Sequence, residues 1–281
     1  MKITKFENKI VIDEPKDFDV IQTLNCGQIF RFVIDGNSAK VYSMDKYAHI
    51  TWDGKMVVIC TDNVEYFYYF FDLDRDYSQI KDKLRKDDFL KSAVDYGSGI
   101  RIINNDVYEI IISFIISANN NIKRIKNSIE YLCQHFGKNL GDYFAFPTLN
   151  ELKKVTIQQF KQAGLGYRAE QMFATVQKLT DKDIESLKSR NKEQQFKFLL
   201  SLKGVGEKVA NCIMLFGLGV KDVFPVDTWI NKVYNDLTNT NTTDRKKITQ
   251  ELTARYKDLS GYAQQYFFYY YRDNKINTRI K

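Results

Sequence analysis

The spacing of hydrophobic positions changes once along the chain, near residue 75. Before that point, short runs of β-branched and aromatic residues alternate with polar turns, which favours strands. The runs are 10–12, 28–34, 40–44, 49–52 and 56–60. Asp35-Gly36 and Asp53-Gly54 stand in two of the gaps, and this dipeptide supplies the positive φ angles of tight hairpins. We expect an antiparallel sheet here.

From about Tyr77 the apolar positions recur with the period of an α-helix. One continuous apolar face runs through Val107–Ile115, and residues 122–136 repeat the pattern after a polar junction, Ser-Ala-Asn-Asn-Asn, at 117–121. Further helices are expected at about 150–163, 167–180, 193–202, 207–217, 228–238, 244–258 and 261–273.

The predicted fold class is therefore α+β. An antiparallel β domain with covering helices is expected at residues 1–95, followed by a mostly helical body at residues 96–281. The body contains a helix–hairpin–helix at 193–217, and its C-terminal helix packs back onto it.

Composition narrows the function classes without selecting one. Lysine and arginine number 42 against 35 acids, a net charge of +7, which suits a polyanion such as nucleic acid. The four cysteines form no C-x-x-C pair, which argues against zinc, iron–sulfur clusters and a disulfide framework. With no signal peptide and no run of about 18 apolar residues, we expect no membrane partner and a cytoplasmic protein.

Gly204-Val205-Gly206 separates two apolar helical segments. Glycines allow a sharp turn and close approach to a large ligand, and the free N–H groups that open the second helix suit a phosphate. Gly204 and Gly206 are thus candidate DNA-backbone contacts. A plain helical hairpin is the alternative for this tripeptide alone.

Lys208 and Asp227 are the candidate catalytic pair. Lys208 lies in the first turn of the second helix, where the helix dipole disfavours a cation, and neutral lysine is a nucleophile. Asp227 stands at the N-cap position of the next helix. Taken alone, Lys208 would be interpreted as a surface lysine and Asp227 as a helix cap. Their spacing around the hairpin favours a catalytic role for the pair.

Together, L-x-G-V-G-x-K-V-A and P-V-D resemble the helix–hairpin–helix superfamily of DNA glycosylases, and the lysine marks the branch with both glycosylase and lyase activity. No C-x6-C-x2-C-x5-C follows, so the iron–sulfur branch is disfavoured. Three further segments and the terminal helix are similar to the 8-oxoguanine DNA glycosylases, in the same order. They are Leu24–Arg31, Phe114–Arg124, Gly164–Arg168 and Gly261–Phe268.

The resemblance implies a pocket for the damaged base. The backbone carbonyl of Gly27 would accept the N7–H that 8-oxoguanine has and guanine lacks. Gln264 would bond the Watson–Crick edge, and Cys212 and Phe268 would sandwich the base. Phe216 stands where a methionine lines the family's pocket.

The resemblance also implies contacts to the duplex. Asn119 would fill the gap left by the flipped base, Tyr167 would wedge the stack, and Arg124 and Arg168 would read the orphaned cytosine. Two departures concern this surface: Lys203 replaces the proline common before Gly-Val-Gly, and Trp229 replaces a histidine that contacts phosphate.

The function expected is excision of 8-oxoguanine and formamidopyrimidine-guanine from double-stranded DNA, preferably opposite cytosine, by a monomeric base-excision repair enzyme. A lysine Schiff base and β-elimination need no redox cofactor and no catalytic metal. A structural cation at the hairpin carbonyls stays open. So do two alternatives: a glycosylase for another lesion such as alkylated purines, and a non-enzymatic DNA-binding module. In a prokaryote, the protein would associate with the nucleoid.

Overall fold

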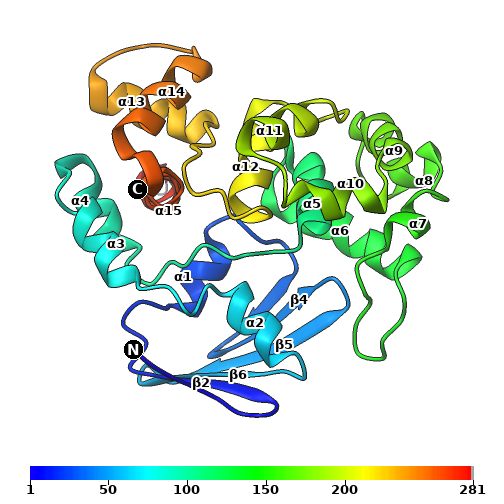
Figure 1. Cartoon of the computed structure of the whole chain (residues 1–281), viewed down its shortest axis with the longest axis horizontal. Coiled ribbons are helices and arrows are strands. Elements are labelled where there is room, and N and C mark those ends of the chain that lie inside the picture. Colours follow the sequence, from blue (N-terminus) through cyan, green and yellow to red (C-terminus); the bar gives the residue numbers. More distant parts are fainter. Residues whose placement is uncertain (280–281) are drawn as a thin grey trace.

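A computed structural model describes residues 1–279 and confirms the α+β class (Figure 1). All strand pairings in the six-stranded sheet are antiparallel, in the order β1-β2-β6-β5-β4-β3. The strands are β1 (Lys2–Lys5), β2 (Lys9–Asp13), β3 (Phe32–Asp35), β4 (Ser38–Ser43), β5 (Lys46–Trp52) and β6 (Met56–Cys60).

The helices of the first third are α1 (Val20–Asn25), α2 (Val64–Phe70), α3 (Tyr77–Leu84) and α4 (Asp88–Tyr96). Those of the body are α5 (Val107–Ser117), α6 (Ile122–Phe136), α7 (Leu149–Leu152), α8 (Ile157–Gln162), α9 (Arg168–Lys178), α10 (Asp181–Leu187), α11 (Lys192–Leu200), α12 (Glu207–Phe216), α13 (Thr228–Thr238), α14 (Arg245–Tyr256) and α15 (Ser260–Arg279). A 3-10 turn, Lys257–Leu259, joins the last two.

The sheet buries one face against its own helices. Ile10 and Ile12 of β2 are fully buried and stand opposite Ile59 and Val57 of β6, as the alternation of a half-buried strand requires. Aromatic side chains of α2, chiefly Phe67, cover this face and complete a small separate core.

Within the part expected to be strands, α1 and α2 are helices, and the run predicted at 28–34 becomes a strand only at Phe32. Hydrogen bonds to distant segments explain why the first residues of the 28–34 run are not in a strand. Buried Gln28 donates to the carbonyls of Thr23 and Arg101 and accepts from the N–H of Ile103, which holds residues 28–30 off the sheet ladder.

The helix predicted at 150–163 is two short helices, α7 and α8. Thr156 forms a capping box with Gln159, which starts a new helix after residue 155. The extra helix α10 begins in the same way, with Thr180 as its N-cap. Local caps therefore overrode the longer apolar period.

Helix α5 is the centre of the larger core, because every residue from Val107 to Ile116 is buried. Helices α3 and α4 pack in this core against α15 (Figure 1), as ring contacts between Tyr77 and Tyr262 and between Tyr96 and Tyr269 show. Within residues 1–279, no helix is long and apolar enough to cross a membrane.

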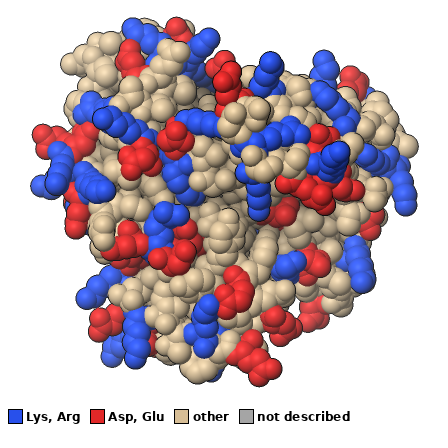
Figure 2. Space-filling view, viewed as in Figure 1, with Lys and Arg blue, Asp and Glu red and all other residues tan. Residues whose placement is uncertain are grey.

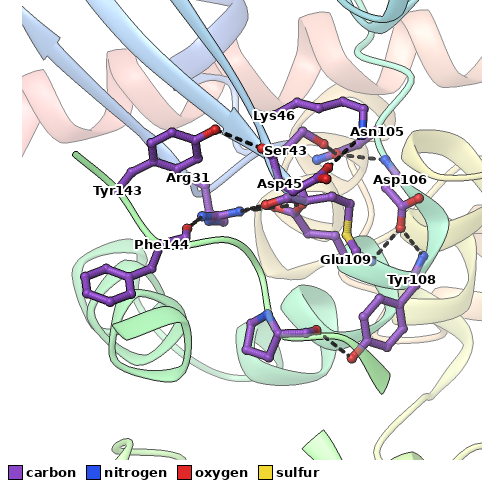
Figure 3. Close-up of polar contacts among 12 residues, drawn as sticks. Arg31, Ser43, Asp45, Lys46, Asn105, Asp106, Tyr108, Glu109, Tyr143 and Phe144 are labelled. Atoms are coloured by element: carbon purple, nitrogen blue, oxygen red, sulfur yellow. Dashed lines mark hydrogen bonds and ion pairs between the residues drawn. The ribbon is translucent and has the colours of Figure 1, made fainter. Parts of the chain in front are cut away.

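A buried polar cluster joins the sheet to the helical body (Figure 3). The guanidinium of Arg31 donates to the carbonyls of Met44 (3.0 Å) and Phe144 (2.6 Å), and lies 4.0 Å from the carboxylate of Glu109 on α5. Glu109 in turn accepts the N–H of Met44 at 2.6 Å. Burial, opposed by Arg31, raises the pKa of Glu109 to about 7.

Candidate active site and DNA-binding surface

The helix–hairpin–helix is confirmed, with α11 and α12 joined by a tight turn. Gly204 has a φ of +82°, and the N–H of Val205 donates to the carbonyl of Leu202 at 3.3 Å. Gly206 is the N-cap of α12 and has no side chain to satisfy the first N–H groups of the helix. These groups are available to an anion.

Lys208 is the second residue of α12 and is partly buried. Its ammonium lies 5.4 Å from the ring centroid of Phe114, within the range of a cation–π contact. Phe114 itself stacks on Phe216, with centroids 5.6 Å apart. Thus Phe216 supports the ring that lies next to the candidate nucleophile, a role that the sequence did not predict.

Cys212 lies one turn along α12, and both members of the candidate pair affect the pKa of its thiol. Burial is the main cause that raises the pKa of its thiol; Lys208 lowers it and Asp227 raises it further. The three side chains therefore share one site. Among the ion pairs of residues 1–279, none joins Lys208 to Asp227, so they flank the site without forming a salt bridge.

Asp227 is the N-cap of α13, as the sequence predicted. Its Oδ1 accepts the N–H groups of Trp229 and Ile230, each at 2.9 Å. The cap fixes where the carboxylate stands relative to α12. Its half-buried position leaves it accessible from the site. Within residues 1–279, no three His, Cys, Asp or Glu side chains gather as for a metal ion.

Gly27 and Phe268 come together from opposite ends of the chain. Gly27 has a φ of +81°, and a Cβ placed on it would stand 3.0 Å from Cε1 of Phe268. A side chain there would thus be strained and would press on the ring. The structure thus brings these two candidate pocket residues into contact.

Gln264 lies one turn before Phe268 on α15 and is almost completely buried. Its Oε1 has no hydrogen-bond partner in the structure. An unpaired buried acceptor costs about 1–3 kcal/mol, so this atom calls for a donor from a ligand or water. Close by on α15, a Cβ on Gly261 would collide with Leu215, so this helix packs directly against α12.

Two residues that the sequence reasoning missed attach α15 to the Gly27 segment. The amide of Gln265 donates to the carbonyl of Cys26 at 3.2 Å, and the guanidinium of Arg272 donates to the carbonyl of Asn25 at 2.7 Å. Arg272 also lies over the ring of Phe268. Polar residues inside an otherwise aromatic helix were the signal that could have revealed them.

The asparagine junction between α5 and α6 contacts the start of α9. Asn119 is exposed and has a left-handed backbone, with φ of +49°. Arg168 is buried and donates to the carbonyls of Ala118 (2.6 Å) and Asn119 (2.5 Å). The Arg168 guanidinium thus points inward. To contact cytosine, the side chain would have to move or use the N–H groups that these two carbonyls leave free, so this contact stays a prediction.

The other two residues predicted to contact the duplex are exposed. Tyr167 has 59% of its surface accessible and holds its ring 4.5 Å from the Arg168 guanidinium. Arg124 lies in the first turn of α6, whose N-cap is Asn121. Both side chains are free of burial constraints.

Charged side chains of both signs cover the face of the molecule shown in Figure 2. Lysines and arginines lie among aspartates and glutamates over the helical body and the sheet alike. On this face the net positive charge is not gathered into one patch.

Comparisons with known proteins match nearly the whole chain. Residues 10–111 match the 8-oxoguanine DNA glycosylase N-terminal domain, and residues 112–258 match the HhH-GPD superfamily of base excision DNA repair proteins. The N-glycosylase/DNA lyase OGG1 of Arabidopsis thaliana is 32% identical over 64% of this chain and 56% of its own length. The N-glycosylase/DNA lyase of Saccharomyces cerevisiae is 36% identical over 48% of this chain and 41% of its own.

The aligned stretches thus span about half the length of these two relatives. A solved structure covers more: the Clostridium acetobutylicum 8-oxoguanine glycosylase/lyase, in complex with double-stranded DNA containing cytosine opposite 8-oxoguanine. It is 36% identical over 98% of this chain and 99% of its own, with a TM-score of 0.92. The chain therefore belongs to the HhH-GPD superfamily of base excision DNA repair proteins, and within it to the 8-oxoguanine DNA glycosylases.

Proposed function

We propose that this chain is a DNA glycosylase with lyase activity that removes 8-oxoguanine from duplex DNA. The observation that carries the proposal is the contact of Gly27 with Phe268, one turn from the buried Gln264, on a helix that packs against the helix bearing Lys208. Elements from both ends of the chain build this pocket. The family membership and the likeness to the Clostridium acetobutylicum enzyme support it.

The pocket groups match the chemistry that distinguishes the lesion. 8-Oxoguanine carries an N7–H donor that guanine lacks, and the backbone at Gly27 offers a carbonyl acceptor. The unpaired Oε1 of Gln264 is an acceptor for the N–H donors on the base's Watson–Crick edge. The ring of Phe268 provides a flat apolar face for the base to stack on.

Because a duplex conceals the bond between C1′ and N9, the nucleotide must first be rotated out of the stack. The hairpin N–H groups would hold the backbone while Asn119 and Tyr167 occupy the vacated space. The amine of Lys208, once it has given up its proton, bonds to C1′ as the C1′–N9 bond breaks and the base departs with its electron pair. The carboxylate of Asp227 stabilises the positive charge that develops on the sugar.

The lyase step follows from the same bond. Ring opening of the sugar gives a Schiff base between Lys208 and C1′, which acidifies the C2′ protons. Loss of one such proton expels the 3′ phosphate by β-elimination. The chain's own side chains supply each role, so we propose that neither a redox cofactor nor a catalytic metal takes part. A structural cation at the hairpin remains a separate prediction.

Cytosine is the opposite base that Arg124 suits best, since its guanidinium can donate to the O2 and N3 acceptors of cytosine. We also propose formamidopyrimidine-guanine as a second substrate, action as a monomer, and a location with the genomic DNA: the cytoplasm, on the nucleoid, in a prokaryote. Duplex DNA with an oxidised guanine is then the partner.

Borohydride trapping on a duplex with 8-oxoguanine opposite cytosine tests the proposal. The wild-type chain should form a covalent complex, and Lys208→Gln should form none while still binding the duplex. Trapping of Lys208→Gln at the wild-type level would refute the assignment of the nucleophile.

A lesion panel separates the proposal from its alternatives. Single-turnover excision should be fastest on 8-oxoguanine and formamidopyrimidine-guanine, and much slower on alkylated adenine. Equal rates on all three would favour a broad glycosylase. Lesion-independent binding without strand scission would favour a DNA-binding module.

A further inference from the structure

One face of α9 supports the hairpin from behind. Gln171, Thr175 and Lys178 are spaced four and three residues apart, so they line one side of the helix. The hydroxyl of Thr175, which is fully buried, donates to the carbonyl of Lys203 at 2.8 Å. A Cβ on Gly204 would stand 3.0 Å from the side chain of Gln171.

The hairpin is a type II turn over residues 202–205. The N–H of Val205 closes it onto the carbonyl of Leu202, and the third residue, Gly204, has the positive φ that a type II turn requires. Lys203 is the second residue and has no positive φ. In such a turn the middle peptide, between Lys203 and Gly204, points its carbonyl to one side and its N–H to the other.

That middle peptide can take two orientations in a turn of this kind. Rotation by half a turn would convert type II into type I and reverse both groups, and glycine makes the rotation easy. The Thr175 hydroxyl binds the carbonyl and thereby selects one orientation. The N–H of Gly204 then faces away from α9, and among residues 1–279 it has no acceptor.

We propose that Thr175 is a positioning residue for the DNA-backbone clamp: its hydroxyl holds the peptide between Lys203 and Gly204 so that the Gly204 N–H is presented to a phosphate. A hydrogen bond to the carbonyl also polarises the same peptide and strengthens its N–H as a donor. The inference deepens the proposed function, because it rests on duplex DNA binding at this hairpin.

Lys203 makes this support more important in this chain. Proline is common at the second position of a type II turn, because its ring fixes φ near −65°. Lys203 leaves the turn without that constraint. Lys178 adds a second link between α9 and the hairpin: its ammonium donates to the carbonyl and the hydroxyl of Ser201, at 2.8 and 3.0 Å.

The test measures the affinity for a duplex that carries a tetrahydrofuran abasic-site analogue. Thr175→Val keeps the shape but removes the hydroxyl and should raise the Kd about ten-fold, the worth of one charge-assisted hydrogen bond. Excision of 8-oxoguanine at saturating enzyme should stay within about two-fold of wild type. Thr175→Ser retains the hydroxyl and should bind like wild type.

Rescue at the turn distinguishes positioning from general packing. In the Thr175→Val background, Lys203→Pro should restore most of the lost affinity, because the ring fixes φ at the second position and the following Gly204 takes the positive φ that only the type II form requires. Lys203→Ala is the matched control: it removes the same charge without the ring and should not rescue.

Wild-type affinity in Thr175→Val, or equal effects of Lys203→Pro and Lys203→Ala, would overturn the inference. Failure of the proposed function would instead appear in the wild-type chain, as absent excision of 8-oxoguanine.

Discussion

At the residue scale, Asp227 combines a structural and a chemical task that substitution can separate. Both cap bonds go to Oδ1, from the N–H groups of Trp229 and Ile230. An uncharged side chain with the same acceptor would keep the cap. The charge that influences the neighbouring Cys212 would then be lost.

Asp227→Asn should therefore slow base excision by about a hundred-fold or more, because stabilisation of the developing positive charge disappears. Its free energy of unfolding should stay within about 0.5 kcal/mol of wild type, since asparagine caps as well as aspartate. Asp227→Ala should lose about 1 kcal/mol in addition. Single-turnover kinetics measure the excision rates, and urea unfolding measures the free energies of unfolding. Excision by Asp227→Asn at the wild-type rate would show that the carboxylate has no role in the mechanism.

At the element scale, the first turns of α6 and α9 differ in how firmly they hold their arginines. Arg168 of α9 is buried and bonded to the carbonyls of the asparagine junction, so it holds the position of Asn119. Arg124 of α6 is exposed, next to the equally exposed Lys123. The exposed arginine is therefore the better test of opposite-base recognition.

Arg124→Ala should reduce the preference for cytosine over adenine opposite 8-oxoguanine, by about 1–3 kcal/mol, with little change in stability. Lys123→Ala removes the same charge from the same turn and should leave the preference intact, although binding weakens at every opposite base. Excision rates opposite the four bases measure this. An identical loss of preference in both variants would assign it to charge alone.

At the scale of the whole molecule, the cluster of Arg31, Glu109 and Met44 links the sheet to the helical body (Figure 3). Burial raises the pKa of Glu109 from 4.5 to about 7. The folded chain therefore keeps the Glu109 proton over a pH range in which the unfolded chain has lost it. This contribution to stability is complete below pH 4.5 and is lost as the pH rises through 7.

Glu109→Gln should remove this dependence. Between about pH 5 and 7 the free energy of unfolding of wild type should fall relative to the variant by at most about 1.4 kcal/mol per pH unit, and the two profiles should run parallel above pH 8. Urea unfolding across this range measures the difference. Parallel profiles throughout would show that the Glu109 proton is not retained on folding.

Helix–sheet organisation was predictable where a local signal was strong. Apolar periodicity identified α5, α6 and α12, and Asp-Gly located two turns of the sheet. The prediction from apolar periodicity failed for α1 and α2, because a short helix with aromatic or β-branched residues has the same sequence pattern as a strand. The strand prediction also failed at residues 28–30, which Gln28 holds through bonds to distant backbone groups.

By itself, the sequence determined the helix–hairpin–helix, the cap at Asp227 and the place of Lys208 at a helix start, because turns, caps and periods depend on residues a few positions apart. Only the tertiary structure decided that Gly27 meets Phe268, that Phe114 lies under Lys208, and that Thr175 supports the hairpin. Such contacts join segments far apart in the chain. Their geometry follows from how whole helices pack, which no local pattern encodes.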